Sequence, residues 1–180
     1  MNTPASFATL STDSCKQELV GFLLSLSIHH PDAKVYIMCD TKTKEYYDDM
    51  SFKPRLQLKW FTTLDKYTAF NRAQMEAMNI FGEFLEYKNI IIKQALMYES
   101  DCLFLDSDII ITHAINDVDK SKSLGVSPGF IKKHIEDKYG VYNAGMIWTN
   151  DKNMPDLWKK YNLTSRYFEQ ASIEDLHKEY

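Results

Sequence analysis

Two aspartates separated by one residue, Asp106 and Asp108, follow the short apolar segment 102–105, and a second apolar run comes after them. The first apolar run is predicted to be a strand buried on both faces. In extended backbone, side chains two residues apart point to the same side, so both carboxylates would converge where the strand ends. Open α/β sheets bind ligands at that end. Two hard oxygen donors there suit Mg²⁺ or Mn²⁺ carrying phosphate oxygens.

An Asp-Ser-Asp triplet by itself is more often a solvated turn or a helix cap than a metal site. In this chain the triplet is delivered by a hydrophobic strand and followed by another apolar run. Two charges between core-like segments are costly to bury unless they are paired. A bound cation is one way to keep them there, and the sequence therefore predicts a metal site at this triplet.

Length and composition predict one globular domain that spans residues 1–180. The chain has 180 residues, 44% apolar and 26% charged, which is enough for a sizeable core and ordinary for a folded domain. The formal net charge is −4 and no long basic run is present. Nucleic acid is therefore not expected as a partner, because nucleic-acid binding depends on clustered positive charge.

The sequence predicts a cytoplasmic location without a membrane-spanning segment. No apolar stretch approaches the ~20 residues needed to cross a bilayer, and the first residues lack the basic and apolar regions of a signal peptide. The three cysteines, Cys15, Cys39 and Cys102, are far apart and form no CxxC pair. This spacing argues against a disulfide framework or a zinc site and fits a reducing compartment.

The first third of the chain alternates between predicted strands and helices. Strands are expected at 7–10, 34–39 and 56–61, with a helix that ends near residues 29–30 and a helical turn at 43–49. Ser14 and Gln17 form a predicted capping box at the start of the first helix. Such alternation predicts a parallel sheet that can bind a nucleotide at its strand ends.

The remainder of the chain is expected to add helices and further strands. Residues 65–100 are predicted to be mostly helical with a break near Gly82, and Lys88 and Lys93 lie among the residues of their apolar face. Further strands are expected at 124–127 and at the end of the segment 139–149, which begins with a turn. The last two helices are predicted at 155–161 and 168–178.

Four segments, taken in chain order, resemble the GT-A glycosyltransferases, and most closely their glycogenin-like and bacterial lipopolysaccharide galactosyltransferase group. The segments are FATLST at 7–12, LFLDSD at 103–108, YNAGM at 142–146 and FEQA at 168–171. The match covers nearly the whole chain, and its order and spacing are fairly specific. One departure is Glu169, where the family has aspartate. The resemblance implies an α/β fold with a Rossmann-like, mostly parallel sheet flanked by helices.

The resemblance also implies a binding site for a nucleotide-sugar donor, with UDP as the family's nucleotide. Thr9, Ser11 and Thr12 would line the base and ribose, Asp40 would touch the base or ribose, and Lys93 would approach the phosphates or ribose. A divalent metal that bridges the diphosphate oxygens makes them a better leaving group. A lysine would add a point charge to the same phosphates.

The later motifs of the resemblance imply which residues would bind the metal and the transferred sugar. Asp106 and Asp108 would hold Mn²⁺ or Mg²⁺, with Ser107 between them in the donor-binding loop. The donor-sugar pocket would be formed by Asn143, Ala144, Gly145, Glu169 and Gln170. Among these, Asn143, Glu169 and Gln170 are the candidate catalytic groups. The acceptor is left open as a glycan, a lipid or a protein.

Two other functions compete with sugar transfer. Haloacid dehalogenase-type phosphatases also place Asp-x-Asp after a hydrophobic strand, but their motif continues with Gly-Thr near the N-terminus, whereas this chain has Ile109-Ile110. A nucleotide-sugar-binding module without turnover would share every site residue. Individual site residues also have simpler structural explanations. The hydroxyls of Thr9, Ser11 and Thr12 are suited to cap the first helix, and most lysines, including those on helices such as Lys93, are solvated. His113 is not expected to bind the metal, because in extended backbone it would point away from both aspartates.

The chain is expected to be truncated at its C-terminus relative to the resembling family. In that family a histidine beyond the glutamine-bearing helix supplies a third metal ligand. Here the only histidine after Gln170 is His177, and its surroundings do not match the family's motif. Two aspartates leave most of the coordination sphere to water and diphosphate. We therefore expect weak donor binding, with slow hydrolysis exceeding transfer.

Overall fold

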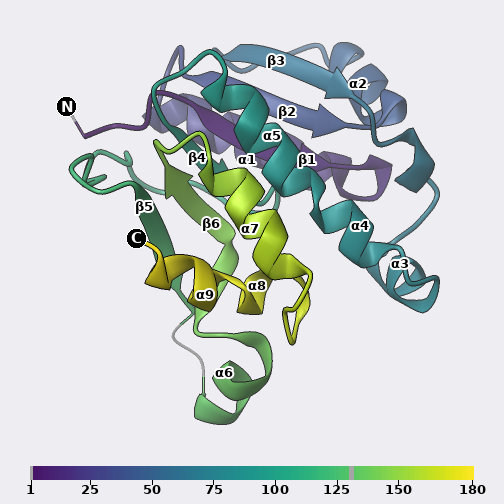
Figure 1. Cartoon of the computed structure of the whole chain (residues 1–180). Helices are drawn as coiled ribbons and strands as arrows, with labels where there is room; N and C mark the ends of the chain where they lie inside the picture. Colours follow the sequence, from purple (N-terminus) through teal and green to yellow (C-terminus); the bar gives the residue numbers. More distant parts are fainter. Residues whose placement is uncertain (1, 130–131) are drawn as a thin grey trace.

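The computed structural model describes residues 2–129 and 132–180, which form a six-stranded sheet with helices on both faces (Figure 1). The strand order is β3-β2-β1-β4-β6-β5. The strands are β1 (Phe7–Ser11), β2 (Lys34–Cys39), β3 (Gln57–Thr62), β4 (Cys102–Leu105), β5 (Leu124–Pro128) and β6 (Tyr142–Thr149). The first four run parallel, whereas β6 is antiparallel to both β4 and β5. The predicted mostly parallel α/β sheet is confirmed.

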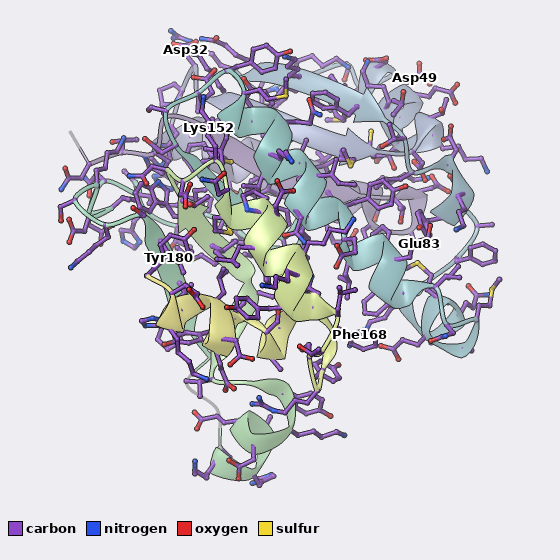
Figure 2. All side chains as sticks on the ribbon, in the orientation of Figure 1. Asp32, Asp49, Glu83, Lys152, Phe168 and Tyr180 are labelled. Atoms are coloured by element: carbon purple, nitrogen blue, oxygen red, sulfur yellow. The ribbon has the colours of Figure 1, made fainter. Side chains whose placement is uncertain are left out.

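Two apolar cores lie on the opposite faces of this sheet. Alternate residues of β1 belong to different cores, because Phe7 packs with α1 (Lys16–His29) and Ala8 packs with α5 (Tyr87–Leu96). The predicted apolar positions of α1 are fully buried, namely Leu19, Phe22, Leu23 and Leu26. Charged side chains such as Asp32, Asp49, Glu83 and Lys152, labelled in Figure 2, are exposed.

The start of the first helix differs from the prediction. A 3₁₀ turn, η1 (Asp13–Cys15), precedes α1, and neither element has a side-chain cap. The hydroxyl of Ser14 lies 3.1 Å from the Thr12 hydroxyl instead of capping the helix. The capping box predicted for Ser14 and Gln17 is therefore wrong, because the extra turn moves the helix start past Ser14. The next helix, α2 (Thr41–Asp48), lies where the helical turn was predicted.

The segment between β3 and β4 is helical but more broken than predicted. It contains η2 (Asp65–Tyr67), α3 (Arg72–Ala77), α4 (Phe81–Leu85) and α5. The break predicted near Gly82 lies at residues 78–80, and Gly82 itself is inside α4. The chain turns at Asn79, whose φ of 57° ends α3 in a left-handed conformation that asparagine tolerates.

After β4, the described residues form four helices: α6 (Lys133–Tyr139), α7 (Met154–Asn162), α8 (Phe168–Ala171) and α9 (Ile173–Lys178). The sequence did not predict α6, which projects from the body and has no buried residue (Figure 1). The single helix predicted at 168–178 is divided at Ser172. Among the described residues, no helix has both the length and the hydrophobicity required to cross a membrane.

Candidate active site

A cavity of about 280 Å³ opens at the C-terminal ends of β1 and β4. These neighbours lie where the strand order reverses, which is the place where open α/β sheets bind ligands. Ten predicted site residues from four separate segments line it: Ser11, Thr12, Asp106, Ser107, Asp108, Asn143, Ala144, Gly145, Glu169 and Gln170. The fold therefore brings most of the predicted site together.

Three predicted site residues do not line this cavity. Thr9 is fully buried within β1. Asp40 is also fully buried, and its carboxylate accepts hydrogen bonds from the backbone amides of Asp13 at 2.9 Å and Thr43 at 2.8 Å. Burial alone would raise the pKa of Asp40, but these donors outweigh it and lower the pKa. Asp40 thus caps α2 and fixes the loop after β1.

The structure contradicts the position predicted for Lys93. Its ammonium lies at the surface of α5 and forms an ion pair with Asp156 of α7 at 2.6 Å. The lysine that reaches the cavity is Lys88, one and a half turns earlier on the same helix. A signal for this was present in the sequence. Lys88 precedes Ile91, Ile92 and Ala95 by three, four and seven residues, which places it on the buried face.

The ammonium of Lys88 contacts acceptor oxygens from three segments that line the cavity. It lies 2.9 Å from Glu169 Oε1, 3.0 Å from Asp106 Oδ1 and 3.3 Å from the Ala144 carbonyl oxygen, so each of its three donors has an acceptor. Burial alone would lower the pKa of Lys88, but the two carboxylates raise it above its ordinary value. The lysine therefore remains charged and holds the end of β4 against α8.

The Asp-Ser-Asp triplet forms a turn, not the extended backbone that its spacing predicted. The amide of Ile109 donates to the Asp106 carbonyl oxygen at 3.2 Å, which closes the turn. Ser107 is buried, Asp106 is partly buried and Asp108 is exposed. Both aspartates nevertheless line the same cavity.

Gly145 lies close to the Asp106 carboxylate. A Cβ at this position would lie 2.6 Å from Asp106 Oδ2, so a side chain here would force that carboxylate to move. The Asp106 amide donates to the Gly145 carbonyl oxygen at 2.9 Å, and the Gly145 amide donates to Asn143 Oδ1 at 2.8 Å. The segment that begins at Asn143 therefore forms the floor beneath the Asp106 carboxylate.

The carboxylates of Asp106 and Asp108 retain capacity to bind a cation. Within residues 2–129 and 132–180, Lys88 is the one ion-pair partner of Asp106, and Asp108 has none. Two carboxylates with open oxygens on one cavity wall fit a divalent cation that takes its other ligands from phosphate and water. Across the described residues, no group of three acidic, histidine or cysteine side chains could hold a metal by itself. His177 does not line the cavity, and its ring packs on Tyr142.

The lining of the cavity also contains Arg72, Phe81 and Tyr167, which the sequence did not single out. Arg72 of α3 donates to the Tyr167 hydroxyl at 2.8 Å, and the rings of Phe81 and Phe168 meet edge to face at 5.2 Å. Phe168 has a φ of 38°, which is uncommon for a residue other than glycine. Aromatic rings, an arginine and carboxylates therefore line the same cavity.

The arrangement of strands and helices matches solved structures of GT-A glycosyltransferases, and the predicted fold class is confirmed. The apo glycosyltransferase GlyE of Streptococcus pneumoniae superimposes with a TM-score of 0.62 at 16% identity, over 99% of this chain and 44% of GlyE. The galactosyltransferase LgtC, in complex with donor and acceptor sugar analogs, gives 0.55 at 14% identity, over 95% of this chain and 70% of LgtC. The bifunctional glycosyltransferase WbbM gives 0.57 at 11% identity, over 98% and 38%.

The chain spans less than half the length of GlyE and of WbbM. No protein-family model matches the sequence, and no curated protein matches it. At these identities, the similarity of the structures establishes the fold, and the activity must be argued from the site.

Proposed function

We propose that this chain is a glycosyltransferase that takes a sugar from a nucleoside-diphosphate donor, a UDP sugar, with the help of Mn²⁺ or Mg²⁺. One observation carries the proposal. The cavity at the switch point of a glycosyltransferase fold combines two carboxylates that have open oxygens with a buried Lys88–Glu169 pair. The acceptor, a glycan, lipid or protein, would enter from the open side of this cavity.

Donor binding would use the end of β1 and the turn after β4. Ser11 and Thr12 line the cavity beside η1, where a base and ribose would lie. Asp106 and Asp108 would hold the cation, which when bound neutralises charge on the diphosphate and makes it a better leaving group. The residues of the chain would then orient the donor and keep its sugar near α8.

The sugar side of the cavity would be shaped by Glu169, Gln170 and Asn143. Glu169 is 7% exposed and is held by Lys88, so it stays oriented within the wall. Lys88 is already engaged by two carboxylates and a carbonyl. In this proposal it therefore acts by positioning Asp106 and Glu169, not as a free charge on the phosphates.

The two alternatives lead to different outcomes in experiments. A haloacid dehalogenase-type phosphatase would carry its aspartate on an N-terminal strand, whereas this motif follows β4 and its first carboxylate is bound by Lys88. A binding module without turnover would use the same contacts as the enzyme. Donor turnover must therefore be measured separately from donor binding.

A thermal-shift screen of UDP, UDP-glucose and UDP-galactose, each with and without Mn²⁺, tests the binding site. Ligand that binds only the folded state stabilises it, by about 2.7 kcal/mol at a hundred times its dissociation constant. We expect stabilisation only when nucleotide and metal are both present. Asp108→Ala should abolish this stabilisation. The control Asp49→Ala, at an exposed position outside the cavity lining, should leave it intact.

Release of UDP from the donor, measured with and without candidate acceptors, then tests the reaction. Metal-dependent binding followed by UDP release supports the glycosyltransferase, and binding without any release supports the binding module. Unchanged metal dependence in Asp108→Ala would contradict the proposed site.

A further inference from the structure

The side-chain amide of Gln170 has a defined orientation in the cavity wall. Its Nε2 donates to the carbonyl oxygen of Tyr139 at 3.2 Å. A carbonyl oxygen can only accept, so the NH₂ end of the amide must face it, and this settles which way the amide is turned. Over the described residues, Oε1 has no protein donor, and Gln170 lines the cavity. Gln170 therefore keeps an acceptor oxygen that no described protein group occupies.

The Tyr139 carbonyl is available because α6 ends at that residue. The last carbonyls of a helix lack partners within it, and Gly140 turns the chain away with a φ of +98° while its amide donates to Glu136 O at 2.8 Å. A Cβ at Gly140 would lie 2.9 Å from the Ala171 Cα. The end of α6 therefore lies directly against the backbone of α8, which carries Gln170.

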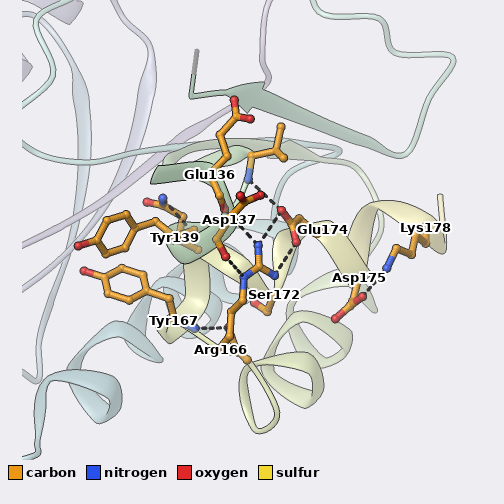
Figure 3. A network of polar contacts seen from close by, with 12 residues as sticks. Glu136, Asp137, Tyr139, Arg166, Tyr167, Ser172, Glu174, Asp175 and Lys178 are labelled. Carbon is orange, nitrogen blue, oxygen red and sulfur yellow. Dashed lines mark hydrogen bonds and ion pairs between the residues drawn. The ribbon is translucent and has the colours of Figure 1, made fainter. Parts of the chain in front are cut away.

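Arg166 holds this end of α6 in place (Figure 3). Its guanidinium donates to the carbonyl oxygens of Asp137 at 3.1 Å and Glu136 at 3.3 Å. It also forms a two-point ion pair with Glu174 of α9, at 2.7 and 3.0 Å. Only a planar, forked donor makes these contacts together. Helix α6 has no buried residue, and these contacts hold its C-terminal end together with the packing of the Tyr139 ring on Tyr167 at 4.4 Å.

Glu174 extends the same network to the start of β6. Its Oε1 accepts a hydrogen bond from the Val141 amide at 3.0 Å, and the Arg166 guanidinium lowers the pKa of this carboxyl group. The carboxylate is therefore ionised at neutral pH and joins α9, the α6 end and β6. Arg166 lies outside the cavity lining, so any effect on the reaction must pass through other residues.

We propose that Arg166 and Gly140 are positioning residues for sugar transfer. They hold the Tyr139 carbonyl, which turns the Gln170 amide so that its oxygen, and not its NH₂ group, faces the donor sugar. This inference rests on the proposed function. Glycosyl transfer develops positive charge on the sugar in the transition state, and a fixed dipole with its negative end toward that charge stabilises it.

The orientation itself is tested without any turnover, by ¹⁵N NMR of the unliganded chain. The side-chain NH₂ signals of Gln170, assigned by their loss in Gln170→Ala, should be well separated and slow to exchange with water. Arg166→Lys keeps the charge but loses the fork, and it should collapse both signals toward those of a free glutamine. Arg55→Lys is the matched control, because Arg55 forms a similar two-point pair with Asp32 at an exposed position. Unaltered signals in Arg166→Lys would overturn the proposal.

The catalytic consequence is tested by a double-mutant cycle on UDP release. Displacement of a reacting group by ~1 Å can cost a hundredfold in rate. We expect Arg166→Lys to lower kcat by about tenfold or more with donor KM within about twofold, and to have no further effect in a Gln170→Ala background. An equal loss in both backgrounds would show a merely structural role and overturn the proposal.

Gly140→Ala provides a second variant with the same expected pattern, because a side chain there meets the α8 backbone. Its matched control is Gly21→Ala, in α1, where a Cβ would lie 3.4 Å from the nearest side chain. A wild-type chain that binds donor but never releases UDP would refute the catalytic role. The NMR result would still decide whether Arg166 orients the amide, so the two failures can be distinguished.

Discussion

Strand β4 carries an aspartate at each end, and the structure uses the two carboxylates in opposite ways. Asp101, just before the strand, is 2% exposed and fully occupied. Its Oδ1 accepts from the Ala5 amide at 2.8 Å and the Trp148 indole at 3.0 Å, and its Oδ2 accepts from Lys120 at 2.8 Å. This carboxylate joins the N-terminus, β6 and the segment before β5, and it has nothing left to offer a ligand.

Asp106, directly after the strand, has one oxygen bound by Lys88 and the other on the cavity side, above Gly145. Both residues are aspartates that flank the same strand, and each pairs with a lysine, Lys120 for Asp101 and Lys88 for Asp106. They differ because Asp106 has an oxygen without a lysine partner and lines the cavity, whereas both oxygens of Asp101 are occupied. A carboxylate with a free oxygen beside a cavity is the one that can bind a cation, and substitutions test this difference.

The largest effect is expected from Lys88→Met, which removes the partner that Asp106 shares with buried Glu169. A buried charge that loses its partner destabilises a protein by about 3–5 kcal/mol. The free energy of unfolding, from urea denaturation, should fall by about this amount. Lys93→Met is the control on the same helix. It breaks an exposed pair with Asp156 and should cost less than about 1 kcal/mol. Similar losses in both variants would contradict the buried network.

A smaller effect is expected from Asp101→Asn at the other end of the strand. The amide oxygen can still accept from Ala5 and Trp148, but the NH₂ group then faces the Lys120 ammonium. The loss of a buried charge-assisted contact should lower the free energy of unfolding by about 2 kcal/mol. Metal-dependent UDP binding, measured by calorimetry, should keep its affinity. A loss of that affinity would show that the two ends of β4 are not separate in function.

The smallest effect concerns acid stability. Burial would raise the pKa of Asp101, but Lys120, the Ala5 amide and Trp148 more than compensate and lower it from the ordinary 3.8. A depressed folded-state pKa contributes stability above the unfolded pKa and loses it as the pH falls through the folded value. Between about pH 5 and about pH 2, the urea midpoint of the wild-type chain should therefore fall more steeply than that of Asp101→Asn. Parallel curves would argue against the lowered pKa.

Much of the fold could be predicted from periodic patterns, whereas most of the residues that line the cavity were implied by the resemblance to GT-A glycosyltransferases. The strands at the centre of the sheet are short apolar runs that end in polar residues, as at Ser11 and Asp106. Parallel strands bring such ends to one edge, so residues far apart in sequence meet there. The same argument does not decide which lysine joins them. On α5 the choice between Lys88 and Lys93 depends on the face that the helix turns to the sheet.

Local chemistry could not predict features that depend on distant partners. The Asp-Ser-Asp turn and the failed cap at Ser14 result from how the chain leaves each strand, which the residues alone leave open. Helix α6 lacked an apolar pattern to reveal it. Its end is held by Arg166, which lies far along the chain and has no partner that sequence spacing indicates.

The close contact between Gly145 and Asp106 also constrains how this protein can diverge. A Cβ at 145 would meet both Asp106 Oδ2 at 2.6 Å and Asn143 Oδ1 at 3.1 Å, so even alanine forces the carboxylate to move. In homologous chains we therefore expect positions 145 and 106 to covary. Where position 145 carries a side chain, position 106 should no longer be aspartate, and such a lineage would have given up the proposed cation site.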